Sequence, residues 1–186
     1  MQPTNLTNQL LIAMPGLNDT SFFHTVTYIF SHNEYGALGI VINRPLELDL
    51  GEVLKQMDFK TSNNQINNTT VYYGGPVQTD RGFVLHEPNA KWQSTINVSN
   101  KISVTTSMDI LKAISEGKGP KKLFIALGYA GWQAGQLEQE IKDNAWLNAP
   151  SGSEIIFDAP FGRRWESAAA LLGIDLERLS SQIGHA

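Results

Sequence analysis

The sequence predicts a mixed α/β fold of the α+β class, in one domain that spans residues 1–186. Strand patterns dominate the first half of the chain, and strand and helix patterns alternate in the second half. No internal repeat is visible, and no Pro- or Ser-rich linker divides the chain. A length of 186 residues suits one domain with a sizeable core.

The composition excludes several classes of protein. Hydrophobic residues at 41% and charged residues at 17% are typical of a globular chain. With no cysteine, disulfide scaffolds, thiolate zinc sites, iron–sulfur clusters and cysteine nucleophiles are excluded. A net charge of −4 argues against direct nucleic-acid binding, because that binding needs a basic face. The polar start "MQPTNLTNQ" and the lack of a run of about 18 apolar residues predict a cytoplasmic protein with no membrane contact.

The first half is read as strands around one helix. After a polar tail at residues 1–9, the apolar run 10–14 predicts a strand, and "HTVTYIFSH" and "ALGIVIN" around "NEYG" predict a hairpin. Apolar residues at helical spacing from Leu50 predict a helix with Asp49 as its N-cap. Residues 60–70 are expected to form an exposed, flexible loop. "VYY", "GFVLHE" and "ISVTTS" predict three further strands, with the Asp80-Arg81-Gly82 segment as a tight turn.

The second half alternates between helices and strands. Ser107 is expected to cap the helix "MDILKAISEG", which Gly117 ends. "KKLFIALG" predicts a buried strand, "WQAGQLEQEIKDNAW" a helix and "EIIFD" a last strand. Pro160 suits the first turn of a closing helix, and Asp175 a cap of a short helix at the C-terminus.

Neither a metal site nor a catalytic residue follows from the sequence. His24 and His32 lie near the two ends of one predicted strand, about 26 Å apart at roughly 3.3 Å per residue, and cannot hold one ion. His86 is on a strand and His185 is beside the last residue. No G-x-S-x-G or H-E-x-x-H motif occurs, and a single S-x-x-K match lacks its companion motifs. We therefore expect no metal, no cofactor and no catalytic group.

One glycine segment is a candidate for binding an anion. "LFIALGYAGWQAGQLEQEI" reads as strand, glycine turn and helix, the setting in which helix N-terminal amides bind phosphate. Gly128, Tyr129 and Gly131 would form the turn, with Tyr129 and Trp132 available to stack on a ring. The spacing matches neither the dinucleotide fingerprint nor the Walker loop, so a purely structural turn is the favoured alternative.

Two arginines on predicted turns are the other candidates for ligand binding. Asn43 and Arg44 follow a strand and precede Pro45, and Arg81 lies in the Asp-Arg-Gly segment. We expect these turns to contribute to one positively lined surface for an anionic ligand or an acidic partner. The alternative is that both arginines make ordinary ion pairs, and the Arg163-Arg164 pair is read as a solvated helix face. In "YYGGPV", Gly74 is expected to take a positive φ as a structural residue.

Three long motifs carry a resemblance to a known family. "LIAMPGLNDTSFFHTVTYIFSHNEYGALGIVINRPL", "YYGGPVQTDRGFVLHE" and "FIALGYAGWQAGQLEQEI" follow one another in the chain. Together they resemble the AlgH/YqgE family of bacterial proteins, from about Leu10 to Leu172. The characteristic positions of that family fall here on Met14, Pro15, Gly16, His32, Asn33, Asn43, Arg44, Pro45, Gly74, Gly75, Pro76, Gly128, Tyr129, Gly131 and Trp132.

The resemblance implies a single cytoplasmic domain whose large mixed sheet folds into a pseudo-barrel with flanking helices. It implies no catalytic roles, because the activity of the family is not established; one branch is named for a proposed role in regulating alginate synthesis. The sequence therefore predicts a ligand- or partner-binding protein with a regulatory role. The alternatives are an enzyme acting on a phosphorylated or nucleotide-like small molecule and a transcriptional regulator, the latter disfavoured because no helix-turn-helix signal is present.

Overall fold

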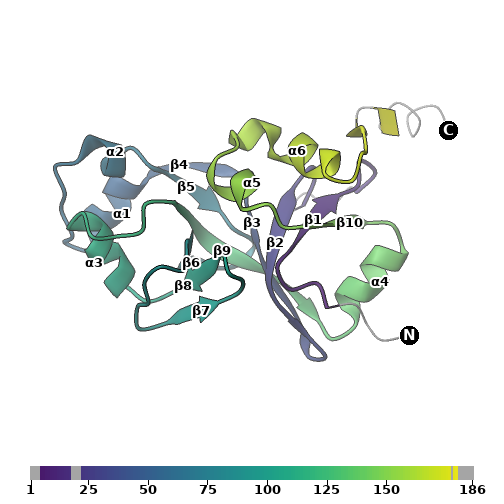
Figure 1. Cartoon of the computed structure of the whole chain (residues 1–186), viewed down its shortest axis with the longest axis horizontal. Helices are drawn as coiled ribbons and strands as arrows, with labels where there is room; N and C mark the ends of the chain where they lie inside the picture. The colour runs from purple at the N-terminus through teal and green to yellow at the C-terminus, as the bar shows by residue number, and fades with distance from the viewer. Residues whose placement is uncertain (1–4, 18–21, 177, 180–186) are drawn as a thin grey trace.

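The computed structural model describes residues 5–17, 22–176 and 178–179, and a curled mixed sheet organises them (Figure 1). Its strands are β1 Gln9–Ala13, β2 Val26–Asn33, β3 Gly36–Val41, β4 Pro45–Asp49, β5 Thr70–Tyr73, β6 Val77–His86, β7 Thr95–Asn97, β8 Ser103–Thr105, β9 Leu123–Gln133 and β10 Trp146–Pro150. The main path through the sheet runs β10-β1-β2-β3-β9-β6-β8-β7. The branch β4-β5 joins β9, and the β5–β9 pairing is parallel whereas the others are antiparallel. The predicted α+β class and the large mixed sheet folded into a pseudo-barrel are confirmed, and the curled sheet has the form of a half-barrel.

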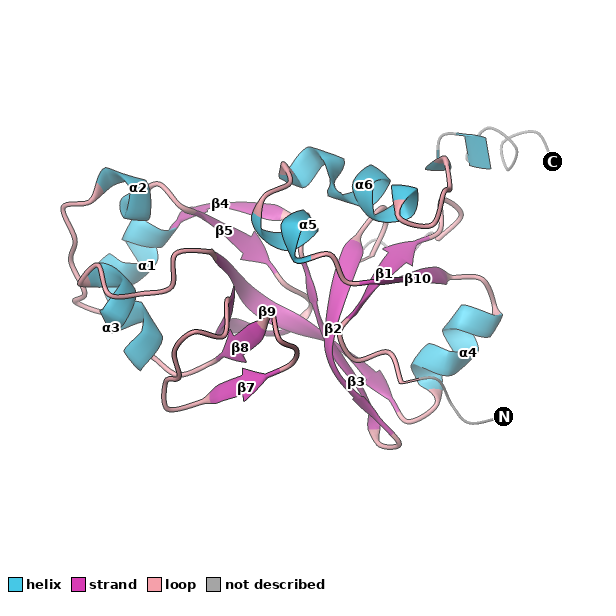
Figure 2. Ribbon diagram, in the orientation of Figure 1, coloured by secondary structure: helices cyan, strands magenta, loops and turns pink. Residues whose placement is uncertain are grey.

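Helices close the two ends and one edge of this sheet (Figure 2). Within the described residues they are α1 Leu50–Gln56, α2 Asn64–Asn67, α3 Asp109–Ser115, α4 Gln136–Lys142, α5 Ser153–Phe157, the 3-10 turn η1 Phe161–Arg163 and α6 Arg164–Ala170. Helices α1 to α3 gather at one end of the molecule, and α4 lies at the other (Figure 1). No helix in these described ranges is both long enough and apolar enough to cross a membrane.

The predicted hairpin and the first helix are confirmed, since β2 pairs with β3 and α1 begins after Asp49. At the N-terminus of α1, the backbone N–H of Asp49 donates to the Glu52 carboxylate (3.4 Å). Gly117, with φ +75°, follows α3 as expected of a helix-ending glycine. The closing helix also forms, although its first turn is the 3-10 turn η1 after Pro160.

Four element predictions were wrong. The segment "EIIFD" lies in helix α5 and its cap, and the last strand is β10, whose first residue, Trp146, had been assigned to the preceding helix. Residues 60–70 are exposed or half-buried, but they are not only a loop, because they contain helix α2, whose cap Asn63 accepts hydrogen bonds from two backbone amides. Ser107 is not the cap of α3, because Met108 occupies that position. The tail at residues 1–9 is structured from Asn5 on, and Leu6 is buried beneath the sheet.

The cap predicted at Asp175 has partial support. Its carboxylate accepts a hydrogen bond from the backbone of Arg178 (3.4 Å), as an N-cap would. Residues 176, 178 and 179 are helical, whereas residue 177 and residues 180–186, including His185, lie outside the described residues.

Strands β6 and β9 correct the two predicted loops. Strand β6 runs without a turn through Asp80, Arg81 and Gly82, and strand β9 runs through Gly128 and Gly131. The irregularity is a bulge: β6 has five steps from Val77 to Gly82 where β9 has two between their partners. The glycine-containing segments that suggested turns therefore lie where the two long paired strands β6 and β9 have a bulge.

Candidate functional site

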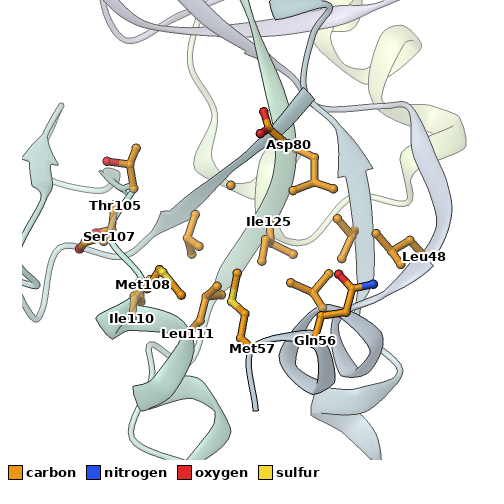
Figure 3. A pocket seen from close by; sticks show the side chains of 16 residues that line it. Leu48, Gln56, Met57, Asp80, Thr105, Ser107, Met108, Ile110, Leu111 and Ile125 are labelled. Atoms are coloured by element: carbon orange, nitrogen blue, oxygen red, sulfur yellow. The ribbon is translucent and has the colours of Figure 1, made fainter. Parts of the chain in front are cut away.

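A cavity of about 250 Å³ opens at the end of the molecule that carries α1 and α3 (Figure 3). Helices α1 and α3 form one wall, and the sheet forms the other. Most of the lining is aliphatic or thioether. The lining residues are Leu48, Val53, Gln56, Met57, Val71, Asp80, Gly82, Val84, Thr105, Thr106, Ser107, Met108, Ile110, Leu111, Ile125 and Leu127.

The two helices turn apolar side chains toward the sheet because their apolar residues recur at helical spacing. Helix α1 buries Leu50, Val53 and Leu54, and helix α3 buries Ile110, Leu111 and Ile114. A methionine lies at the cavity end of each helix: Met57 directly follows α1 and Met108 precedes α3, with Met108 56% exposed. Figure 3 shows both along the helical wall. Methionine side chains are flexible and adapt to varied apolar partners.

Strand β6 separates its charges between two faces. Asp80, Gly82 and Val84 line the cavity, whereas the guanidinium of Arg81 lies 5.4 Å from the ring centre of Phe83 on the other face. This alternation is that of an extended strand. Asp80 is consequently the only charged residue in the lining.

Gly82 leaves the strand wall without a side chain at its centre. A Cβ atom built at this position would have no atom within 4 Å, and the backbone there does not have a positive φ. The glycine is thus not required by its own conformation or by close packing. Its effect is to keep the cavity open between Asp80 and Val84.

The cavity mouth lies where β8 separates from β6. Strand β8 pairs with β6 at three positions, of which Thr105–Val84 is the last. The chain then turns away: Thr106 N–H donates to Ser94 O (3.1 Å), and the Ser107 hydroxyl donates to the Asp109 carboxylate (2.5 Å). In the described part of the chain, no strand pairs with this edge of β6 before Val84.

A buried polar chain supports the wall behind Thr105. His86 Nδ1 donates to Glu87 O (2.8 Å), so Nε2 accepts from the Thr105 hydroxyl (2.7 Å). The Thr105 oxygen accepts from Thr95 (2.8 Å), which accepts from Trp92 N–H (2.8 Å). Burial lowers the pKa of His86, opposed by its hydrogen bond to Glu87 O. His86 and Thr105 are both fully buried, so this is a structural network and not an accessible nucleophile–base pair.

Asn43 and Arg44 hold the loop that precedes β2. The Asn43 amide accepts from Val26 N–H (2.9 Å) and donates to His24 O (2.9 Å), and Arg44 donates to Phe23 O (3.0 Å). These bonds fix His24, whose φ is +55° and whose ring stacks between Phe23 and Trp165. The contacts give both residues a structural role that sequence reasoning had not assigned.

Arg81 and Tyr129 are brought near each other through Phe83. The Tyr129 ring packs edge-on against Phe83 at 5.6 Å, and Arg81 also donates to Gln78 (3.4 Å). Arg44 therefore contacts the loop before β2, whereas Arg81 contacts its own strand. A surface shared by Arg44 and Arg81 stays a prediction, and the tight turn assumed for Arg81 does not exist.

The predicted glycine turn was also wrong, because Gly128 and Gly131 lie inside β9. A methyl group at Gly128 would overlap Gly75 O, and one at Gly75 would overlap the backbone of Tyr129. The positive φ expected at Gly74 falls instead on Gly75 and Gly128. These glycines allow two backbones to touch, which is a packing role.

Arg163 and Arg164 differ, contrary to the prediction that both are solvated. Arg163 is exposed, whereas Arg164 is 5% exposed and donates to Ile42 O, Ile156 O (2.9 Å) and Ala159 O (3.2 Å). Its guanidinium also lies over the rings of Tyr72 and Phe124. Arg164, at the start of α6, thus connects this helix to α5 and to the residue that follows β3.

His32, outside the cavity, is also structural. His32 Nδ1 accepts from Leu6 N–H (2.9 Å), and its Nε2 pairs with the Glu138 carboxylate of α4. No group of three histidine, aspartate or glutamate side chains among the described residues could hold a metal ion.

Sequence reasoning missed the cavity because its lining comes from distant segments. Asp80 was read as part of a turn, and Met57 and Met108 as ordinary helix residues. The available signal was a small residue in a strand pattern, Gly82, next to a charge on the face that should be buried. That signal becomes informative only once β6 is known to be one continuous strand.

Similar proteins match this chain over nearly its whole length. A family model described as AlgH-like matches residues 10–177. The UPF0301 protein Tgr7_2910 of Thioalkalivibrio sulfidiphilus is 57% identical over 98% of each chain, and a UPF0301 protein of Chromobacterium violaceum is 48% identical over 100% of each.

Two solved structures resemble the chain. The solution structure of the AlgH protein from Pseudomonas aeruginosa has a TM-score of 0.81 at 50% identity, covering 100% of this chain and 98% of that one. Protein DIP2367 of Corynebacterium diphtheriae has a TM-score of 0.75 at 20% identity, covering 97% and 94%, which shows a shared fold alone. From the matched residues and the identities, the chain belongs to the AlgH-like family.

Proposed function

We propose that this chain is a cytoplasmic binding protein with a regulatory role, and that it takes an apolar group of a protein partner into the cavity between α1, α3 and the sheet. The observation that carries this proposal is an open apolar cavity with a single carboxylate, Asp80, in its lining. Apolar pockets with a few directed polar groups are the usual form of a binding site.

The size of the cavity favours a side chain over a free small molecule. Its volume of about 250 Å³ lies below the roughly 300–1,000 Å³ of typical small-molecule sites. Protein partners commonly insert one aromatic or aliphatic anchor into such a pocket, and the anchor carries much of the binding energy. Met57 and Met108 can adjust to the shape of the anchor.

The charge at the mouth favours a cation over an anion. Asp80 faces the cavity, while Arg81 points to the opposite face, so an anionic group in the cavity would meet a like charge and no cation. We therefore propose a partner with a basic residue beside its apolar anchor, in place of the anionic ligand expected from the sequence. The chain's net charge of −4 would favour the approach of such a partner.

Binding, and not catalysis, is the activity proposed, because the hydroxyl–imidazole pair in the wall is buried and its hydrogen bonds are made within the protein. The proposed regulatory role would be exerted through this binding of a partner. Fractionation of cells that express the untagged chain tests the proposed cytoplasmic location.

The binding test uses three small aromatic probes that differ in charge. Benzylammonium, benzyl alcohol and benzoate are titrated into the full chain, and amide NMR shifts of β6 and α3 are followed. We expect benzylammonium to bind most tightly and benzoate most weakly, and we expect Asp80→Asn to remove the advantage of benzylammonium over benzyl alcohol. Asp143→Asn, beyond α4, is the matched control and should preserve that order. Shifts scattered over the surface, or none for any probe, would refute the proposal.

A further inference from the structure

The edge of β6 beside the cavity has the properties of a vacant strand position. Strand β8 covers this edge from His86 to Val84 and then departs toward α3. Across the described residues no other strand covers this edge from Val77 to Phe83, while on the opposite edge β9 pairs with Val77, Gly82 and Phe83 and the residues between Val77 and Gly82 form the bulge. An uncovered strand edge presents backbone donors and acceptors to which another chain can add.

The side chains along this edge differ in what they would accept opposite them. Residues directly opposite in an antiparallel pair have Cβ atoms about 4.5–5.5 Å apart, so each β6 residue selects its partner. Gly82 has no side chain and nothing within 4 Å of a Cβ position, which leaves room for a large opposite residue. Aromatic residues are known to fill the space opposite strand glycines.

Asp80 is on the same face, two residues before Gly82, and is exposed. A carboxylate on a strand is stabilised by an opposite cation and destabilised by an opposite anion. An added strand would therefore place an aromatic residue opposite Gly82, reaching the cavity, and a basic residue opposite Asp80.

We propose, resting on the binding function above, that the partner presents an extended segment that adds to β6 as an antiparallel strand, continuing the position that β8 vacates. An antiparallel segment reaches Gly82 before Asp80, so its pattern from N- to C-terminus is aromatic, any residue, then lysine or arginine. The cavity binds the aromatic ring, β6 backbone groups bind the segment's backbone, and Asp80 binds the cation.

The probe is the capped peptide Thr-Val-Phe-Thr-Lys-Thr, titrated into the full chain by calorimetry and by amide NMR. N-methylation of its backbone amides, one at a time, should weaken binding roughly threefold to tenfold at alternate positions only, because alternate amides of an added strand face β6. Asp80→Lys should weaken binding of the lysine peptide and strengthen binding of the same peptide with glutamate in place of lysine. Asp143→Lys should do neither.

The outcomes separate this inference from the binding function on which it rests. If benzylammonium binds in the cavity but N-methylation weakens the peptide at no position, or equally at all positions, strand addition is wrong and the cavity function stands. If neither probe nor peptide binds, both are wrong. If β6 amide shifts change with protein concentration before any peptide is added, a second copy of the chain occupies the edge, and the assignment to a partner segment is overturned.

Discussion

Two regions of the sheet treat their polar groups in opposite ways. Beside α5 and α6, the buried Arg164 donates to three backbone carbonyls and stacks over two aromatic rings, so that region is closed. Beside α1 and α3, the edge of β6 is unpaired with β8 before Val84, and an apolar cavity adjoins an exposed carboxylate. Both regions belong to one sheet, but only the first satisfies its polar groups inside the chain.

This difference indicates where stability and binding reside. A buried guanidinium is retained only if its donors are satisfied, so the Arg164 region is expected to be sensitive to substitution. An open edge and an unfilled cavity contribute little to folding, so surface positions of the β6 edge and the cavity should tolerate substitution while losing binding. Each prediction that follows would break or sharpen this contrast.

The largest effect is expected for Arg164→Ala. It would leave the carbonyls of Ile42, Ile156 and Ala159 buried without this donor, at about 1–3 kcal/mol for each unsatisfied group. We expect the free energy of unfolding to fall by about 3 kcal/mol or more, measured by urea denaturation. The neighbouring Arg163→Ala, at an exposed residue, should change it by less than about 0.5 kcal/mol. Equal losses of unfolding free energy for the two variants would show that Arg164 does not close the region beside α5 and α6.

A smaller loss of stability is expected where the backbone at Gly75 touches strand β9. In Gly75→Ala, the new methyl group would overlap the backbone of Tyr129, so the strands must separate. Overpacking of this kind costs about 1–3 kcal/mol. Gly131→Ala lies on the same strand as Tyr129, but its methyl would meet only ordinary contacts, the nearest at 3.6 Å. Thermal unfolding that ranks Gly131→Ala as the more damaging change would contradict the backbone-contact explanation.

The pH dependence of stability should further distinguish the β6 region, which contains His86, from the Arg164 region. Burial lowers the pKa of His86 below its usual 6.5, so below about pH 6.5 the unfolded chain binds a proton that the folded chain resists. Stability should therefore be full above that pH and fall on acidification. His86→Gln should reduce the slope of melting temperature against pH between about pH 7 and pH 5, with His24, whose pKa burial also lowers, supplying part of the remaining slope. Arg164→Met should leave the slope unchanged, since arginine stays charged throughout this range.

Local patterns predicted much of the fold correctly. The alternation around "NEYG" predicted the β2–β3 hairpin, and Asp49 marked the start of α1. "EIIFD" misled because a short apolar run has no period; it forms α5, which buries Ile155 and Ile156. Gly128 and Gly131 misled because glycine marks close backbone contact within strands as well as turns.

The candidate site could not be predicted in the same way. Arg164 has the same local sequence context as Arg163, and only the position of Ile42, far away in the chain, makes one of them buried. Likewise, Gly82 lies beside an uncovered strand edge only because β8 stops pairing with β6 at Thr105, and no local pattern encodes that. Both features depend on tertiary contacts between distant segments.

The most direct test of the central claim fills the cavity at Gly82. The Gly82 backbone has no positive φ and a Cβ atom there has no neighbour within 4 Å, so we expect leucine to fit and to project between Asp80 and Val84. Gly162→Leu, at an exposed glycine that also has open space around a Cβ position, is the matched control. In amide NMR titrations with benzylammonium, we predict that Gly82→Leu abolishes the shifts at β6 and α3 while its melting temperature stays near that of Gly162→Leu, which binds as the native chain does. Undiminished binding by a folded Gly82→Leu variant would contradict the assignment of the cavity as the binding site.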